Sequence, residues 1–84
     1  MEADEPLDLR GLKCPLPALM TRRQLARLPD GAVLKVLTSD PLAVVDIPHM
    51  CGEDGHALVE SRKADDHHIF TIRKGTQTGG LAGG

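Results

Sequence analysis

The segment LDLRGLKCPLP, residues 7–17, decides the fold because it indicates a strand, a turn and a helix start in succession. Apolar and polar residues alternate over residues 7–10, which predicts a short strand. Gly11 then allows a turn. The two prolines of the segment suit the first turn of a helix, because a backbone N–H there has no partner within the helix. We therefore expect a strand followed by a helix that runs to Leu28.

The middle of the chain predicts a second strand and a second helix. Residues 32–38 are rich in Val and Leu, which is typical of a buried strand. Asp40 and the proline after it suit the cap and first position of a helix. Because Pro48 would interrupt a continuous helix, we expect an irregular first turn in which Asp46 acts as a second cap.

The remaining strands complete a small sandwich. Residues 56–63 and 67–74 indicate two strands joined by a hairpin at 64–66. In the order β-α-β-α-β-β, right-handed crossovers place both helices on one face of the sheet. We predict an α/β (α+β) two-layer sandwich with a mixed four-stranded sheet whose other face is solvated or covered by a partner. The domain is expected to span residues 6–74, and a flexible Gly-rich tail residues 75–84.

Composition and charge disfavour several classes of protein. A chain of 84 residues fits one small domain. The net charge is −2 and Phe70 is the one aromatic residue, which disfavours direct nucleic-acid binding. Arg22, Arg23 and Arg27 form a basic face on the first helix, for which a solvated surface is the simpler interpretation. The acidic start differs from a signal peptide, and no apolar stretch approaches the roughly 18 residues of a membrane span. We expect a cytoplasmic protein that does not contact membranes.

Cys14 is the candidate reactive residue. It lies between a strand end and a helix start, where unpaired N–H groups and the helix dipole favour a thiolate and lower the pKa. Lys13 and Arg10 add positive charge, and Pro15 and Pro17 stiffen the turn. A small buried cysteine is the alternative, but these flanking residues argue against it.

The surroundings of Cys14 in the sequence limit its chemistry. The nearest histidines are His49 and His56, so a Cys-His hydrolase requires the fold to bring one of them close. No second cysteine lies nearby, which disfavours a dithiol oxidoreductase. What remains is a lone nucleophile that accepts a group and passes it on. A persulfide suits such a site because its terminal sulfur is anionic.

Residues 7–17 resemble the signature of the TusA/SirA family, whose hallmark is Cys-Pro-x-Pro at the start of the first helix. Further matching segments are 29–31, 38–41, 46–48 together with Cys51, and 55–56. The resemblance covers nearly all of residues 6–74. It implies a two-layer sandwich similar to the C-terminal domain of translation initiation factor three.

The resemblance also implies a function. It suggests a sulfurtransferase-type carrier with a persulfide on Cys14 and with Pro15 and Pro17 as motif residues. Sulfur would come from a cysteine desulfurase or a rhodanese-like donor and pass to an acceptor protein in tRNA thiolation, molybdenum cofactor synthesis or sulfur metabolism. We expect a monomer that needs no cofactor. Some relatives carry an acidic residue at the position of Leu16, so partner identity does not transfer. The alternative is a non-catalytic redox-sensing or regulatory interaction module.

A docking face is expected on the first helix. Four of its residues share the spacing of a core-facing stripe: Ala18, Thr21, Leu25 and Leu28. A different stripe, which begins beside Cys14, consists of Leu16, Met20, Arg23 and Arg27. We expect Leu16 and Met20 to be covered by a partner and Arg23 to attract an acidic surface. The alternative is that the two apolar residues pack under the Leu12 turn or the second helix.

The remaining signals have simpler interpretations. Cys51 is expected to be a buried core residue, too far from Cys14 for a disulfide. The clusters at 49–51 and 65–68 lack the four ligands typical of zinc, so we predict no metal site. The terminal Gly83-Gly84 resembles the ubiquitin-like sulfur carriers, but those open with a hairpin, so a flexible tail is favoured.

Overall fold

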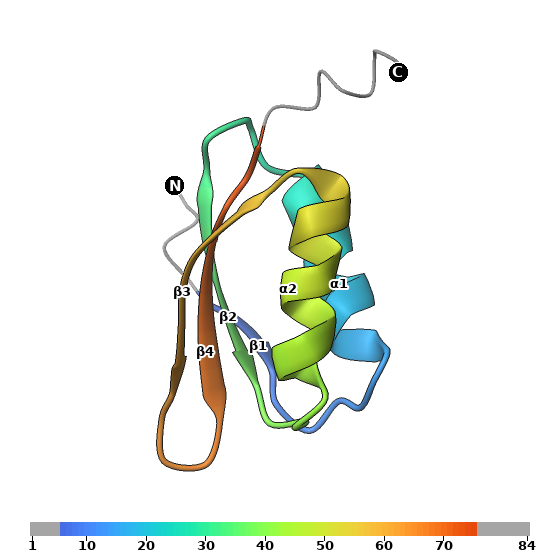
Figure 1. The fold of residues 1–84 in the computed structure, drawn as a ribbon, viewed down its shortest axis with the longest axis vertical. Coiled ribbons are helices and arrows are strands. Elements are labelled where there is room, and N and C mark those ends of the chain that lie inside the picture. The colour runs from blue at the N-terminus through green and yellow to red at the C-terminus, as the bar shows by residue number, and fades with distance from the viewer. Residues whose placement is uncertain (1–5, 76–84) are drawn as a thin grey trace.

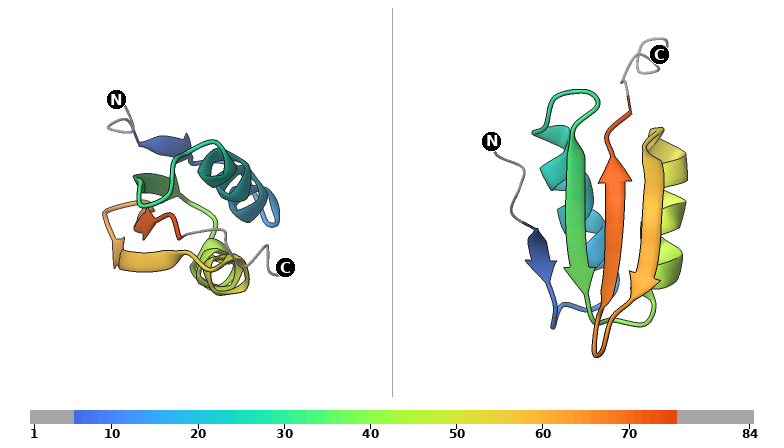
Figure 2. Two further views of the ribbon diagram at one scale, coloured as in Figure 1. Left: turned by 90° about the horizontal axis from the view of Figure 1, so that it is seen from above. Right: turned by 90° about the vertical axis from the view of Figure 1, so that its left-hand side faces the viewer.

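The computed structural model describes residues 6–75. Its elements are β1 (Leu7–Leu9), α1 (Leu16–Ala26), β2 (Val33–Thr38), α2 (Ala43–Asp54), β3 (Ala57–Lys63) and β4 (His68–Arg73). Both helices cover one face of the sheet (Figure 1), and the other face is open in this chain (Figure 2, right). The predicted element order and the two-layer architecture are confirmed. The acidic start and the Gly-rich segment after Gly75 lie outside the described residues.

The sheet is mixed, with strand order β1-β2-β4-β3. β1 runs parallel to β2, whereas β4 runs antiparallel to both β2 and β3. Because β1 and β2 are parallel neighbours, the segments that follow them emerge at the same edge of the sheet. These two segments lead into α1 and α2, and the candidate site is built from them.

The core lies between the sheet and the two helices. Its buried apolar residues are Leu9, Leu25, Leu34, Val36, Ala43, Ile47, Met50, Cys51, Phe70 and Ile72. The core-facing stripe predicted for α1 is confirmed, because Thr21 and Leu25 are fully buried while Ala18 and Leu28 pack against the core. The Thr21 hydroxyl is satisfied inside this apolar layer, since it donates to the carbonyl of Pro17 at 2.7 Å. Within residues 6–75, neither helix is long and apolar enough to cross a membrane.

The start of α2 agrees with the prediction in part. Its first turn is irregular, because the N–H groups of Ala43, Val44 and Val45 donate to carbonyls three residues back. The helix runs without interruption from Ala43 to Asp54 with Pro48 inside it, so Asp46 is not a second cap. Pro48 removes one backbone hydrogen bond, the one to the carbonyl of Val44, and Val44 is exposed. Ile47, directly before Pro48, is fully buried in the core, and such packing outweighs the loss of one bond.

Candidate functional site

Cys14 is exposed in the segment between β1 and α1, just before the helix begins at Leu16. This segment starts with a turn at Gly11, which has a φ of 90°, in the left-handed region that glycine adopts without strain. The thiol therefore lies at the mouth of the first helix, as the sequence predicts.

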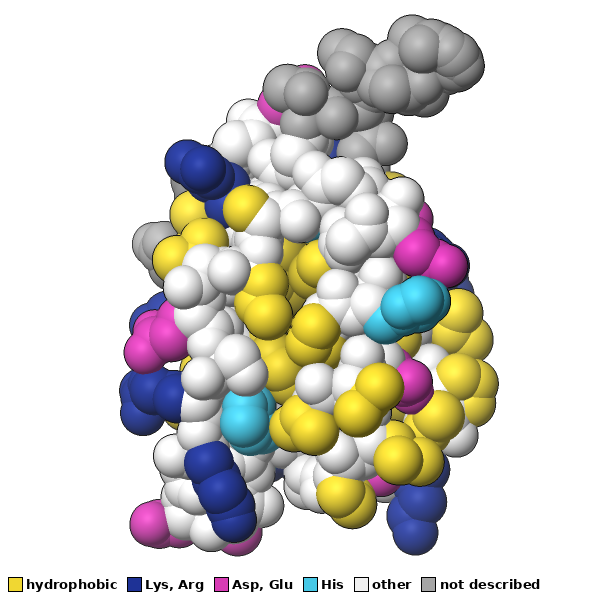
Figure 3. Space-filling model, in the orientation of Figure 1, with side chains coloured by type: hydrophobic (Ala, Val, Ile, Leu, Met, Phe, Trp, Pro, Cys, Tyr) yellow, Lys and Arg dark blue, Asp and Glu magenta, His cyan; other side chains and the backbone are white. Residues whose placement is uncertain are grey.

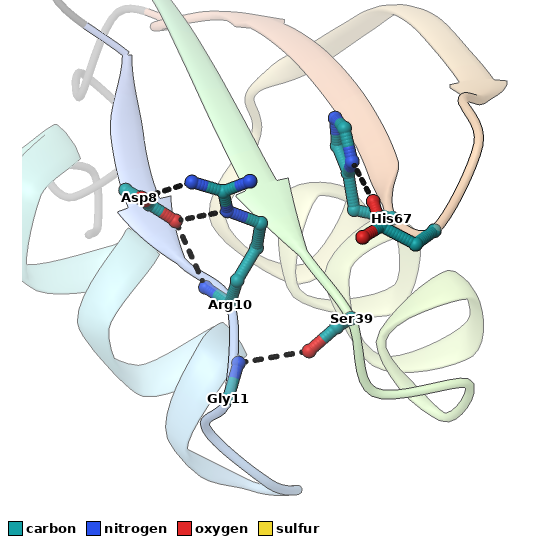
Figure 4. Close-up of polar contacts among 6 residues, drawn as sticks. Asp8, Arg10, Gly11, Ser39 and His67 are labelled. Atoms are coloured by element: carbon teal, nitrogen blue, oxygen red, sulfur yellow. Dashed lines mark hydrogen bonds and ion pairs between the residues drawn. The ribbon is translucent and has the colours of Figure 1, made fainter.

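Two hydrogen bonds from the Cys14 segment anchor it to the segment that follows β2. The backbone N–H of Gly11 donates to the Ser39 hydroxyl at 2.8 Å (Figure 4). The backbone N–H of Cys14 donates to Oδ2 of Asp40 at 2.5 Å. The other oxygen of Asp40 accepts the N–H of Leu42 at the start of α2, at 3.3 Å. Asp40 thus connects the thiol segment to the second helix, a role that needs the two parallel strands to be neighbours.

The thiol itself contacts the first turn of α2. Sγ of Cys14 donates to Oδ2 of Asp46 at 2.8 Å. This hydrogen bond, desolvation and the negative charges of Asp46 and Asp40 raise the pKa of Cys14 above its ordinary value. The lowered pKa predicted from the sequence is therefore wrong, because carboxylates rather than cations face the thiol.

Arg10 does not approach Cys14 as an anion-stabilising group. Its guanidinium forms two bonds to the Asp8 carboxylate, Nε to Oδ1 at 2.9 Å and Nη2 to Oδ2 at 2.8 Å (Figure 4). This contact lowers the pKa of Asp8 to about 2. Residues two apart in a strand share a face, so Arg10 pairs with Asp8 on the open side of the sheet. Lys13 remains exposed next to Cys14 in the chain.

The start of α1 also offers fewer N–H donors than a helix start ordinarily does. Pro15 and Pro17 have no N–H, and the N–H of Leu16 already donates to the carbonyl of Lys13 at 2.8 Å. The Cys14–Pro15 peptide bond is cis. The motif that places the thiol at the helix mouth therefore removes much of the anion stabilisation expected there.

The predicted docking residues are exposed. Leu16 is 44% and Met20 37% exposed, and Arg23 is exposed on the same helix. The alternative, that the two apolar residues pack under the Leu12 turn or under α2, is therefore wrong. Leu19, which sequence reasoning missed, is exposed as well. In the space-filling view, hydrophobic side chains gather at the lower end of α2 and along the right-hand edge formed by α1 (Figure 3).

Cys51 is a core residue, as predicted. Its side chain is 2% exposed, and burial raises the pKa of its thiol to about 11. Two histidines of the clusters contact nearby carboxylates. Nε2 of His49 lies 3.2 Å from Oε2 of Glu53, and Nδ1 of His67 lies 2.8 Å from Oδ1 of Asp66.

A shallow hollow of about 360 Å³ adjoins the Cys14 anchors. It lies between the segment that follows β2 and the β3–β4 hairpin. Asp40 lines it from the first side, and Lys63 and His68 line it from the hairpin.

The site and fold together define a class: a small two-layer α/β protein that presents an exposed cysteine at the start of its first helix. The family model described as Sulfurtransferase TusA matches residues 5–74. The chain therefore belongs to the TusA family of sulfur carrier proteins, as its Cys-Pro-x-Pro segment predicts.

Individual relatives agree with this family. The chain is 38% identical over 74 residues to the sulfur carrier protein TusA of Pseudomonas fluorescens, covering 88% of this chain and 89% of that protein. It is 41% identical over 68 residues to a putative sulfur carrier protein of Neisseria meningitidis, covering 81% and 89%. The crystal structure of a SirA-like protein from Desulfitobacterium hafniense matches with a TM-score of 0.73 and 26% identity, covering 84% of this chain and 97% of that one.

Proposed function

We propose that this protein carries sulfane sulfur as a persulfide on Cys14, between a donor enzyme and an acceptor protein in the cytoplasm. The observation that supports the proposal most directly is the exposed Cys14 thiol at the start of α1. Backbone N–H groups of its segment donate hydrogen bonds to side chains of the segment after β2 and so hold it there. Its hydrogen-bond partner is Asp46 rather than a histidine, which disfavours Cys-His hydrolysis.

The transfer needs no redox partner. The Cys14 sulfur attacks the terminal sulfur of a donor persulfide, the donor S–S bond breaks, and the donor sulfur leaves with the electron pair and takes up the proton that Cys14 gives up. Delivery is the same exchange with Cys14 as the leaving sulfur. A cysteine desulfurase or a rhodanese-like enzyme suits the donor role. The acceptor would act in tRNA thiolation, molybdenum cofactor synthesis or sulfur metabolism.

Loading tests the proposal. After incubation with a cysteine desulfurase and cysteine, the intact protein should gain the mass of one sulfur atom, which a reductant removes. Cys14→Ser should gain nothing, whereas Cys51→Ser should still load. A wild-type protein that never gains sulfur, or loading that follows Cys51, would show that Cys14 is not the carrier residue. A purely regulatory module would also stay unloaded.

We further propose that the donor and acceptor cover the α1 docking face, defined as Leu16, Met20 and Arg23. Burying the two apolar side chains on binding removes water from around the persulfide, and Arg23 attracts an acidic surface. Met20→Glu should leave the fold and Cys14 alkylation nearly unchanged but sharply slow transfer from the desulfurase. Val33→Glu is the matched control, because Val33 is an exposed apolar residue of β2 on the opposite face of the sheet. Equal transfer by both folded variants would place docking elsewhere.

A further inference from the structure

Asp46 is the side chain in direct contact with the Cys14 thiol, and its position is well determined by the fold. Its Oδ2 lies 2.8 Å from Sγ. Its own backbone N–H donates to the carbonyl of Leu42 at 3.0 Å, and the next residue, Ile47, is fully buried. The first turn of a helix is also a favourable place for a carboxylate. The group opposite the thiol is therefore built into α2 rather than placed on a loose loop.

The charged groups that act on the thiol are negative, whereas Lys13, next to Cys14 in the chain, is exposed. Asp46 faces the thiol from α2, and Asp40 faces it from the segment after β2. Arg10, at the end of β1, is engaged by Asp8 on the open side of the sheet. The ion pair between α1 and α2, formed by Arg22 with Asp54, lies about two helical turns further along.

The Asp46 carboxylate has opposite effects on the unloaded thiol and on the loaded persulfide of a sulfur carrier. The unloaded thiol is neutral and has a proton to donate, so the Asp46 carboxylate stabilises it through a charge-assisted hydrogen bond. The loaded persulfide ends in a sulfur anion and has no proton to donate, so the same carboxylate repels it.

We propose that Asp46 biases the carrier toward delivery, by holding the unloaded Cys14 thiol in a hydrogen bond and by repelling the terminal sulfur of the loaded form. This inference rests on the proposed persulfide function. The bias acts on the exchange Cys14–S–S⁻ + R–SH → Cys14–SH + R–S–S⁻. In that exchange one S–S bond breaks, another forms, and the proton moves from the acceptor thiol to Cys14. Asp46 favours the right-hand side without taking part in the net reaction.

The first test is the pH profile of Cys14 alkylation by iodoacetamide, which requires no sulfur chemistry. In Asp46→Asn the profile should move to lower pH, and the rate at pH 7 should rise roughly fivefold to tenfold. That range corresponds to one exposed charge at close range in a high-dielectric setting. Glu53→Gln, which removes an acidic charge from the far end of the same helix, should match the wild type. Asp46→Glu, which keeps the negative charge, should have an alkylation profile close to that of the wild type.

The second test measures the sulfur equilibrium itself. Wild type and variants are incubated with a buffer of 2-mercaptoethanol and its persulfide, and intact mass gives the ratio of loaded to unloaded protein. Asp46→Asn should raise this ratio roughly fivefold to tenfold, and Glu53→Gln should leave it unchanged. If wild-type Cys14 never loads, the proposed function fails and this inference fails with it. If the wild type loads but Asp46→Asn has the same ratio or the same alkylation profile, this inference alone is overturned.

Discussion

Replacement of Lys74 by Met should destabilise the fold by about 2 kcal/mol. Lys74 follows β4 and is 8% exposed, and its Nζ donates to the carbonyl of Leu28 at 2.6 Å, just beyond the end of α1. A hydrogen bond to a charged group contributes about 1.5–3 kcal/mol. A cation at a helix C-terminus adds about 0.3–1 kcal/mol, and the cost of desolvating the ammonium group offsets part of the sum. Met keeps the length of the side chain and removes only the charge and the donor.

Circular dichroism during urea and thermal unfolding measures this effect in a chain without Trp or Tyr. For a domain of this size, about 2 kcal/mol corresponds to a fall in the melting temperature of roughly 8–16 °C. Lys35→Met is the matched control, because Lys35 is exposed on β2, and it should change the free energy of unfolding by less than about 0.5 kcal/mol. If Lys74→Met is as stable as Lys35→Met, the bond to Leu28 does not hold the end of α1 and the reasoning fails.

Three further predictions concern stability. Burial lowers the pKa of His56, whose Nδ1 accepts the N–H of Gly75 at 3.1 Å, so the unfolded chain binds more protons below about pH 6.5. The free energy of unfolding should therefore fall between pH 7 and pH 5, and the fall should be smaller in His56→Asn; identical pH slopes would contradict this. Cys51→Ser should fold but lose about 1–3 kcal/mol by burying a hydroxyl, which denaturant titration measures, and wild-type stability would argue against a tightly packed site. The bond from Arg22 to Asp54, 2.6 Å between Nε and Oδ2, should give a coupling of about 0.5–1 kcal/mol in a double-mutant cycle of Ala variants, and a coupling of zero would mean that the pair does not hold α1 against α2.

Local patterns in the chain were sufficient to predict most of the fold. The apolar periodicity of α1 correctly separated the buried Thr21 and Leu25 from the exposed Leu16 and Met20, because a helix fixes the direction of each side chain from its position alone. The start of α2 was predicted less well. The effect of Pro48 on the backbone is local, whereas the burial of Ile47 that keeps the helix continuous depends on the sheet beneath it.

The candidate site was also predicted in part from local sequence and decided in part by the tertiary structure. That Cys14 lies exposed at the start of the first helix follows from the residues around it. Its charge environment does not, because Asp40 and Asp46 lie 26 and 32 residues further along the chain. Only the parallel pairing of β1 with β2 brings the two segments together. Of the two cations expected near the thiol from the sequence, Lys13 stays exposed. Arg10 is turned to the opposite face by the alternation of strand side chains and is bound there by Asp8. A thiol responds to charges within a few ångströms of its sulfur, and it is the tertiary fold that decides which charges those are.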